Sequence, residues 1–260
     1  MLYSEEKIKA ALGDHRDTVK IIIDDVTAST NDKGKAIAAS GESKNTLILA
    51  YRQHKGKGRM GRSFFSPEGG IYMSLVIPKT GLDPEDIPLI TPAAAVAVCR
   101  AIESLTPAEP KIKWVNDIFC NGGKAAGILT ETVFSSEGFF SVVGIGINLI
   151  PPKGGFPAEL NGIASSVYGE GEEIPQDIMS VLAGTVTREL LDLTVTIPER
   201  GFSEEYRRRS FVIGKDARVI KNGNPTEAHI VDIDKNCRLG VIYRDGSEEY
   251  LLCGEISLRF

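Results

Sequence analysis

Residues 52–77, RQHKGKGRMGRSFFSPEGGIYMSLVI, decide how the chain is interpreted, because a basic, glycine-rich loop runs into an apolar β-strand. Between Arg52 and Arg62 the loop holds five Lys or Arg residues, one His and three glycines. Glycines let backbone N–H groups approach an anion closely, and the basic side chains surround that anion with charge. The stretch therefore predicts a loop that orders around a phosphate or a carboxylate.

The elements around this loop exclude two common glycine-rich sites. Gly56-x-Gly58-x-x-Gly61 matches the dinucleotide fingerprint, but that motif needs a helix directly after the glycines, and here a strand follows. A protein-kinase loop does lie between two strands. However, the only HRD, residues 15–17, is upstream of the loop, and DFG is absent. A solvated basic hairpin without a ligand remains the alternative.

The composition sets this local charge against an acidic background. The 260 residues carry a net charge of −5, with 42% hydrophobic and 25% charged residues, as in an ordinary soluble protein. This balance argues against a protein that coats nucleic acid. The four cysteines form no CxxC and the three histidines show no zinc spacing, so we expect reduced thiols, a cytoplasmic location and no protein-bound metal. We find no apolar signal segment and no run of about 18 apolar residues, so no membrane association is expected.

Hydrophobic patterning predicts an α+β domain over residues 1–209, with a mixed β-sheet and packed helices. Helices are expected at 5–12, 33–39, 87–105, 176–194 and 199–209, and strands at 20–25, 46–53, 70–78 and 139–149. A hairpin is expected from 111–120 and 124–134, around the Asn121-Gly122-Gly123 turn. From about Ser210 the pattern changes to short alternating strands separated by turn signals. Residues 210–260 therefore predict a small β-barrel of about five strands.

Polar residues inside apolar strands form a second set of candidates. Residues 111–118, KIKWVNDI, include the only tryptophan; as one alternating strand, they place Trp114 and Asn116 on one face, opposite Asp117. Asn and Asp are poor strand formers, which favours a polar pocket over a plain strand edge. Lys124 is either a surface charge or the point charge that binds a reacting phosphate.

Glycines within two further strands indicate that another group approaches the backbone closely. Gly127, which follows Lys124 in its strand, would allow close backbone approach. The strand GIGIN, residues 144–148, has two glycines on one face, which suggest a ligand lying across it. A β-bulge is the structural alternative for Gly144 and Gly146.

Six short motifs occur in the order and spacing of the biotin protein ligases. They are Ser29-Thr30-Asn31, Gln53 with GKGRMGR, KWVNDI, GGKAAGILTE, GIGIN and CGEISLR. Each motif is weak alone, but together they are specific, and the chain resembles this family over nearly its whole length. The resemblance implies a class II synthetase-like sheet followed by an SH3-like barrel. About 20 residues precede the first strand, too few for a helix-turn-helix unit, so we expect the form without a DNA-binding domain.

The resemblance implies a two-step acyl transfer. Biotin's carboxylate attacks the α-phosphate of MgATP to give biotinyl-5'-AMP and pyrophosphate. A lysine of a biotin carboxyl carrier protein, such as that of acetyl-CoA carboxylase, then attacks the mixed anhydride. The implied partners are biotin, ATP with Mg²⁺ and the carrier domain, and a homodimer is compatible with the family.

The resemblance also implies roles for those residues of this chain that match the family's motifs. The implied biotin site comprises Ser29, Thr30, Asn31, Gln53, Gly56, Lys57, Gly58, Arg59 and Gly127. The implied nucleotide site comprises Arg59, Arg62, Trp114, Asn116, Lys124, Asn148 and Arg259. The implied catalytic residues are Lys124, Arg59 and Asp117, the last steering or deprotonating the incoming lysine. The chain departs from the family pattern at Lys57 (usually Arg), Met60 (usually basic), Phe64 (Trp in some members) and Val115 (usually Pro).

Two other function classes remain open. A lipoate or octanoyl transferase shares the fold but would lack the GKGRMGR loop. A binding module would use the basic loop on nucleic acid and the barrel as an adaptor; it would show salt-dependent DNA affinity without ATP–pyrophosphate exchange.

Overall fold

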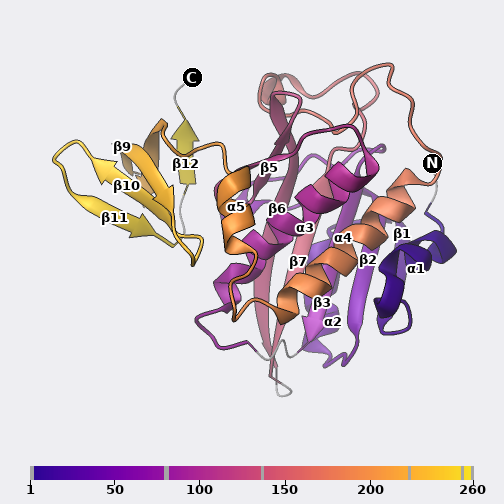
Figure 1. The fold of residues 1–260 in the computed structure, drawn as a ribbon. Helices are drawn as coiled ribbons and strands as arrows, with labels where there is room; N and C mark the ends of the chain where they lie inside the picture. The colour runs from indigo at the N-terminus through magenta and orange to yellow at the C-terminus, as the bar shows by residue number, and fades with distance from the viewer. Residues whose placement is uncertain (1–2, 79–81, 136–137, 222–223, 253–254, 259–260) are drawn as a thin grey trace.

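The computed structural model describes residues 3–78, 82–135, 138–221, 224–252 and 255–258, which form two sheets with packed helices (Figure 1). The larger sheet has seven strands in the order β1-β2-β3-β7-β6-β5-β4. Their bounds are β1 Val19–Thr27, β2 Asn45–Gln53, β3 Ile71–Pro78, β4 Lys111–Lys113, β5 Asp117–Cys120, β6 Gly123–Ser135 and β7 Gly138–Ile147. Because β1 and β2 are parallel and every other pair is antiparallel, the sheet is mixed, as predicted.

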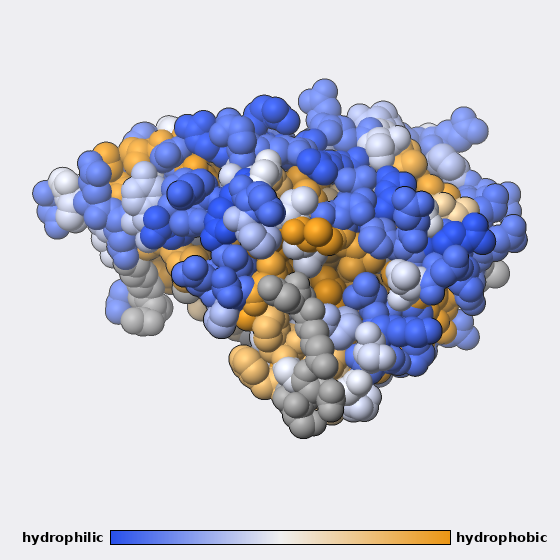
Figure 2. All heavy atoms as spheres, turned by 60° about the horizontal axis from the view of Figure 1, so that its bottom comes forward, coloured by the Kyte–Doolittle hydropathy of each residue, from blue (hydrophilic) through white to orange (hydrophobic). Residues whose placement is uncertain are grey.

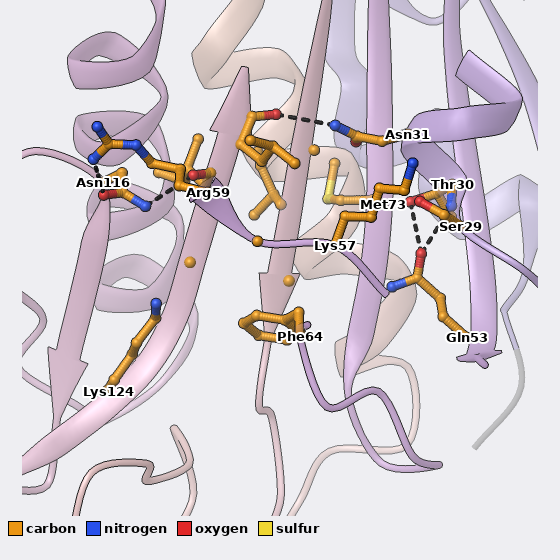
Figure 3. Close-up of a pocket in the computed structure, with 17 residues that line it drawn as sticks. Ser29, Thr30, Asn31, Gln53, Lys57, Arg59, Phe64, Met73, Asn116 and Lys124 are labelled. Atoms are coloured by element: carbon orange, nitrogen blue, oxygen red, sulfur yellow. Dashed lines mark hydrogen bonds between the residues drawn. The ribbon is translucent and has the colours of Figure 1, made fainter. Parts of the chain in front are cut away.

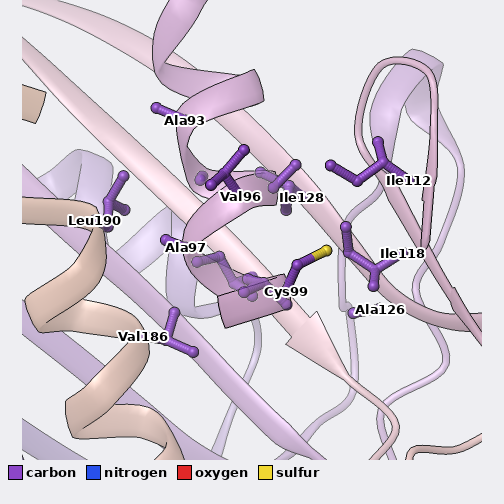
Figure 4. Packing of buried hydrophobic residues seen from close by; sticks show 14 of the residues in the cluster. Ala93, Val96, Ala97, Cys99, Ile112, Ile118, Ala126, Ile128, Val186 and Leu190 are labelled. Atoms are coloured by element: carbon purple, nitrogen blue, oxygen red, sulfur yellow. The ribbon is translucent and has the colours of Figure 1, made fainter. Parts of the chain in front are cut away.

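One face of this sheet is covered by α1 (Glu5–Leu12), α3 (Ile90–Leu105) and α4 (Ile178–Val195). Figure 4 shows Val96 and Cys99 of α3 beside Ile128 and Ile118 of the strands. Alanines let α3 lie close to its neighbours, and eleven of its sixteen residues are buried. With its preceding turn, Ile87–Leu105 is apolar and long enough for a membrane span, but 67% of its most apolar 18-residue window is buried, as in the core helix of a soluble protein.

The opposite face is covered only in part, by α2 (Thr30–Ala39). Successive side chains of β2 point to opposite faces of the sheet. Leu47 faces the large core, and Ile48 faces a small cluster that includes Ala38 of α2. Gly34 lets α2 approach the sheet, because a Cβ at this position would lie 2.8 Å from Val142 Cγ1. The part of this face beyond α2 is therefore available for a pocket.

The chain leaves the first sheet through α5 (Ser203–Arg209) and forms a small antiparallel sheet of five short strands. Its order is β11-β10-β9-β8-β12, with β8 Asp216–Lys221, β9 Asn224–Ile233, β10 Leu239–Tyr243, β11 Glu248–Leu251 and β12 Glu255–Leu258. The pairing of β12 with β8 returns the chain to the start of this sheet. Short 3₁₀ turns lie at Gly13–His15, Arg59–Gly61, Ile87–Leu89 and Ala158–Leu160.

The prediction of one strand over residues 111–120 was wrong. The chain turns at residues 114–116, and β4 pairs back against β5 in the register Lys111–Phe119. Two side chains favour the turn: the Trp114 indole is buried and donates to the Cys237 carbonyl (2.9 Å), and Asn116 donates to the Ile128 carbonyl (3.0 Å). The alternation of faces expected here is consequently lost. The other differences are shifts of element ends; the final helix, for example, begins at Ser203 rather than at 199.

The surface seen from the lower side of Figure 1 is largely hydrophilic, with apolar side chains gathered near its middle (Figure 2). Phe134, near the end of β6, is among the most exposed apolar side chains, at 79%. Scattered exposed apolar side chains are normal on soluble proteins and need no ligand to explain them.

Candidate functional site

A pocket lies on the α2 side of the sheet, between the start of α2, the glycine-rich loop and strands β3, β7 and β6 (Figure 3). Its lining comprises Ser29, Thr30, Asn31, Gln53, Lys57, Gly58, Arg59, Phe64, Met73, Asn116, Lys124, Gly127, Ile128, Leu129, Gly144, Ile145 and Gly146. The pocket has a buried polar end, a floor of glycines and a cationic end.

Side chains at the polar end hold one another in a buried hydrogen-bond cluster. The amide and hydroxyl of Thr30 both donate to Gln53 Oε1 (2.8 and 3.2 Å). Ser74 Oγ donates to Asn31 Oδ1 (2.6 Å), and Asn31 Nδ2 donates to Glu131 Oε2 (3.0 Å). Ser29 caps α2, since its hydroxyl accepts from a backbone N–H of the first turn (3.4 Å). Satisfied buried polar groups fix side-chain orientation, so this end is preorganised for a polar ligand group.

Glycines form the floor because side chains lie directly on the strand backbone. Gly127 of β6 and Gly146 of β7 are register partners. A Cβ on Gly146 would lie 2.5 Å from the Phe64 ring, and a Cβ on Gly144 would lie 2.0 Å from Asn31 Oδ1. The two glycines of β7 therefore face the same side, as predicted, and two side chains of the protein, Asn31 and Phe64, lie against them. The ligand expected across this strand stays a prediction.

The cations at the other end of the pocket come from two segments, the glycine-rich loop and β6. Arg59 Nη1 donates to Asn116 Oδ1 (2.9 Å), and Lys124 Nζ forms an ion pair with Asp117 Oδ1 (2.6 Å). Lys57 of the same loop pairs with Asp32 Oδ1 of α2 (2.6 Å). This hydrogen bond from Lys57, with a further one from Lys35, holds the pKa of Asp32 below its ordinary value.

A second pocket adjoins the first on its cationic side. Its lining comprises Gly58, Arg59, Met60, Arg62, Ser63, Phe64, Lys113, Trp114, Asn116, Asp117, Lys124 and Ile256. Gly58, Arg59, Phe64, Asn116 and Lys124 line both pockets. The arrangement can therefore bring two anions together along a shared, positively charged wall.

The structure brings together most of the residues singled out from sequence. Every residue of the implied biotin site except Gly56 lines the first pocket. A Cβ on Gly56 would lie 2.4 Å from the Phe64 carbonyl oxygen, so this glycine serves the folding of the loop. Of the implied nucleotide residues, Arg59, Arg62, Trp114, Asn116 and Lys124 line the second pocket.

Asn148 and Arg259 are the two exceptions in the nucleotide set. Asn148 lines neither pocket; its side-chain amide donates to the Ser165 carbonyl (3.0 Å) and lies 3.4 Å from the Lys124 carbonyl. It thereby supports the backbone that carries Lys124. Arg259 lies outside the described residues.

Sequence reasoning missed three contributors to the first pocket. Phe64 was noted only as a departure from a family pattern, and Met73 and Ser74 were regarded as ordinary strand residues. Ser74 carried a usable signal, because it is a polar residue inside the apolar strand IYMSLVIP. Among the residues that the structure describes, no group of three or more His, Cys, Asp or Glu side chains could hold a metal ion.

Comparisons with known proteins agree with this geometry. The Biotin/lipoate A/B protein ligase family matches residues 24–148. The bifunctional ligase/repressor BirA of Bacillus subtilis is 38% identical over 174 residues, which cover 66% of this chain and 53% of BirA. The biotin--[acetyl-CoA-carboxylase] ligase of Mycobacterium tuberculosis is 31% identical over 225 residues, covering 82% of this chain and 79% of that protein.

A solved structure shows the same architecture. The biotin protein ligase from Aquifex aeolicus in complex with biotin and ATP superposes with a TM-score of 0.73 at 25% identity, covering 92% of this chain and 98% of that one. The match to the Bacillus proteins spans only about half of their length. The mycobacterial protein, by contrast, is matched over most of its length at more than 30% identity, and the chain therefore belongs to the biotin protein ligase family.

Proposed function

We propose that the protein is an ATP-dependent ligase that activates biotin as biotinyl-5'-AMP and transfers it to a lysine of a biotin carboxyl carrier protein. The observation that carries this proposal is the wall shared by the two pockets, where Arg59, Asn116 and Lys124 lie between a preorganised polar pocket and a cationic one. The names of the relatives and the ligands of the Aquifex structure support the same substrates.

The first pocket suits biotin chemically. Biotin has a polar ureido ring and an apolar chain that ends in a carboxylate. The ureido group would meet Thr30, Asn31 and Gln53, while the glycine floor and Phe64 flank the apolar part. The carboxylate would then point toward Lys124 and Arg59.

Adenylate formation requires two anions to approach each other. Lys124 and Arg59 offset this repulsion, and such preorganised cations are the main source of catalysis in phosphoryl-type transfers. The biotin carboxylate oxygen attacks the α-phosphorus, and pyrophosphate leaves. Mg²⁺ would arrive with ATP as part of the substrate, held by the triphosphate. Closure of residues 56–62 over the product would protect the anhydride from water.

Transfer requires a neutral lysine amine. Asp117 lies beside Lys124 at 2.6 Å, so engagement of Lys124 by phosphate frees this carboxylate. Asp117 then accepts the proton of the incoming lysine, whose nitrogen attacks the acyl carbon, and AMP leaves. The carrier of acetyl-CoA carboxylase is the acceptor that the relatives' names favour.

We further propose the finer organisation that the family suggests. Residues 1–209 form the catalytic domain, and residues 210–260, with their five-stranded antiparallel sheet, form an SH3-like barrel from which Arg259 reaches the nucleotide. Asn148 acts near the nucleotide through Lys124. The protein acts in the cytoplasm as a monomer or homodimer, without binding DNA or membranes.

Biotin-dependent exchange of pyrophosphate into ATP tests this function. We expect exchange only when biotin is present, and a mass increase of one biotinyl group on a carrier lysine. The family match also includes lipoate ligases, so lipoate and octanoate serve as competing substrates. Folded protein that shows no biotin-dependent exchange, or that exchanges with lipoate instead, would contradict the proposal.

A further inference from the structure

Residues 114–116, here called the anchored turn, are each held by a different element. The Trp114 indole N–H donates to the carbonyl of Cys237 in the β9–β10 connection (2.9 Å). The Val115 carbonyl accepts from the hydroxyl of Tyr206 in α5 (3.0 Å), and Asn116 Nδ2 donates to the Ile128 carbonyl of β6 (3.0 Å). Two of these three anchors thus come from chain segments beyond residue 200.

The anchored turn supplies two groups to the second pocket. Trp114 and Asn116 both line that pocket, and Asn116 Oδ1 also accepts from Arg59 (2.9 Å). A shift of the turn would move the indole and break the contact between Asn116 and the glycine-rich loop. The position of the turn therefore sets the shape of the proposed nucleotide site.

Tyr206 is a buried side chain whose hydroxyl acts as a hydrogen-bond donor. It is fully buried, and burial raises the pKa of its hydroxyl well above the ordinary value, so the group stays protonated and can donate. It lines neither of the two pockets. The Val115 residue that it holds is 9% exposed, so without this donor its carbonyl would be a buried, unpaired acceptor, which is costly.

The helix that carries Tyr206 is itself clamped on both sides. Arg207 pairs with Asp232 of β9 (2.7 Å), and Glu205 pairs with Arg100 of α3 (2.6 Å). Arg209 adds a second pair with α3, to Glu103 (2.7 Å). These ion pairs hold α5 between α3 and the C-terminal sheet. The helix therefore keeps the Tyr206 hydroxyl within reach of the Val115 carbonyl.

We propose that Tyr206 is a positioning residue for ATP, acting through the Val115 carbonyl to keep Asn116 and Trp114 in place. This inference rests on the proposed ligase function and deepens it. Tyr206 lies outside residues 24–148, where the family match is found, so its role follows from the contacts of this fold. The tyrosine touches the turn and not the reactants.

Kinetics of Tyr206→Phe test the proposal, because phenylalanine keeps the ring and removes only the hydroxyl. We expect the KM for ATP in pyrophosphate exchange to rise about tenfold, as for the loss of one buried hydrogen bond. The KM for biotin should change by less than about twofold, since the polar end of the first pocket is untouched. Thr187→Val is the matched control: it removes another buried hydroxyl that donates to a backbone carbonyl (2.8 Å), in α4, and should leave both constants unchanged.

Fluorescence provides a second readout that does not depend on catalysis. Trp114 is the only tryptophan in the chain and is 4% exposed, so acrylamide should quench it weakly in the wild type. Tyr206→Phe should make quenching clearly stronger, and Thr187→Val should not.

The outcomes are distinct. Stronger quenching together with a raised KM for ATP alone supports the inference. The inference is overturned if Tyr206→Phe leaves the KM for ATP unchanged, raises the KM values for ATP and biotin equally, or leaves quenching unchanged. In each of these cases, exchange by the wild type still supports the ligase function. A folded wild type without exchange overturns the ligase function and the inference together.

Discussion

The two ends of the site are built in different ways. The proposed biotin end consists of strand backbone and buried side chains such as Asn31 and Thr30, each 4% exposed. The proposed nucleotide end consists of the glycine-rich loop, the turn at residues 114–116 and the start of β6. Its charged groups, Arg59 of the loop and Lys124 of β6, meet partners at the pocket surface. Changes at the first end should therefore lower stability and binding together, because the same contacts serve both. Changes at the second end should affect chemistry with little loss of stability.

The largest effect is expected at the nucleotide end, from Lys124→Ala. Loss of this cation should slow biotin-dependent exchange by about 10²–10³-fold, the size found when a preorganised transition-state contact is removed. Lys33→Ala is a close control, because Lys33 forms a 2.6 Å pair with Asp24 at similar side-chain exposures and lines neither pocket. Both variants should lose the same small amount of stability in urea unfolding. Near-normal exchange by the Lys124→Ala variant would show that Lys124 has no part in adenylate formation.

Gly144→Ala tests the opposite end. The new Cβ would meet Asn31 Oδ1 at 2.0 Å, so Asn31 must move and give up its bonds to Ser74 and Glu131. We expect the free energy of unfolding to fall by about 2–3 kcal/mol and biotin binding, measured by calorimetry, to weaken with it. Gly201→Ala, where nothing lies within 4 Å, should be close to neutral. A stable Gly144→Ala protein with normal biotin affinity would show that the polar end is not rigid.

A smaller effect is expected where the two ends meet, at Phe64. The ring lies 2.5 Å from the position of a Cβ on Gly146, so Gly146→Ala should cost about 1–2 kcal/mol of stability by overpacking. In a Phe64→Ala background the same substitution should cost much less, because the ring has gone. Urea unfolding of the two single variants and the double variant measures this coupling. Additive effects would mean that the ring does not rest on this strand.

Sequence patterns predicted the local structure of the proposed biotin end better than that of the proposed nucleotide end, for a physical reason. Glycines within strands are local signals, and the strand pair that places Gly127 beside Gly146 follows from alternation and order along the chain. The anchored turn depends on Cys237 and Tyr206, which lie about 90 to 120 residues away in the sequence. No local pattern marks such partners, and residues 111–118 were accordingly predicted as a continuous strand.

The smallest effect tests the contact that ties the two ends together, between Lys57 of the loop and Asp32 of α2. The folded pKa of Asp32 lies below its ordinary value of 3.8, chiefly because Lys57 donates to it. The pair therefore stabilises the fold above that value, and the contribution is lost as the pH falls through the lowered pKa. Because both side chains are about 40% exposed, solvent screening should limit the effect to under ~0.5 kcal/mol.

Asp32→Asn measures this contribution. Wild type should be slightly more stable than the variant near neutral pH, and the difference should shrink both in acid and in high salt, which screens exposed pairs. Urea unfolding at several pH values provides the comparison. A difference well above ~1 kcal/mol, or one that persists in acid, would show that Asp32 supports the buried end through the first turn of α2 rather than through the charge of Lys57. In that case Lys57 could leave Asp32 for a ligand at little cost to the fold.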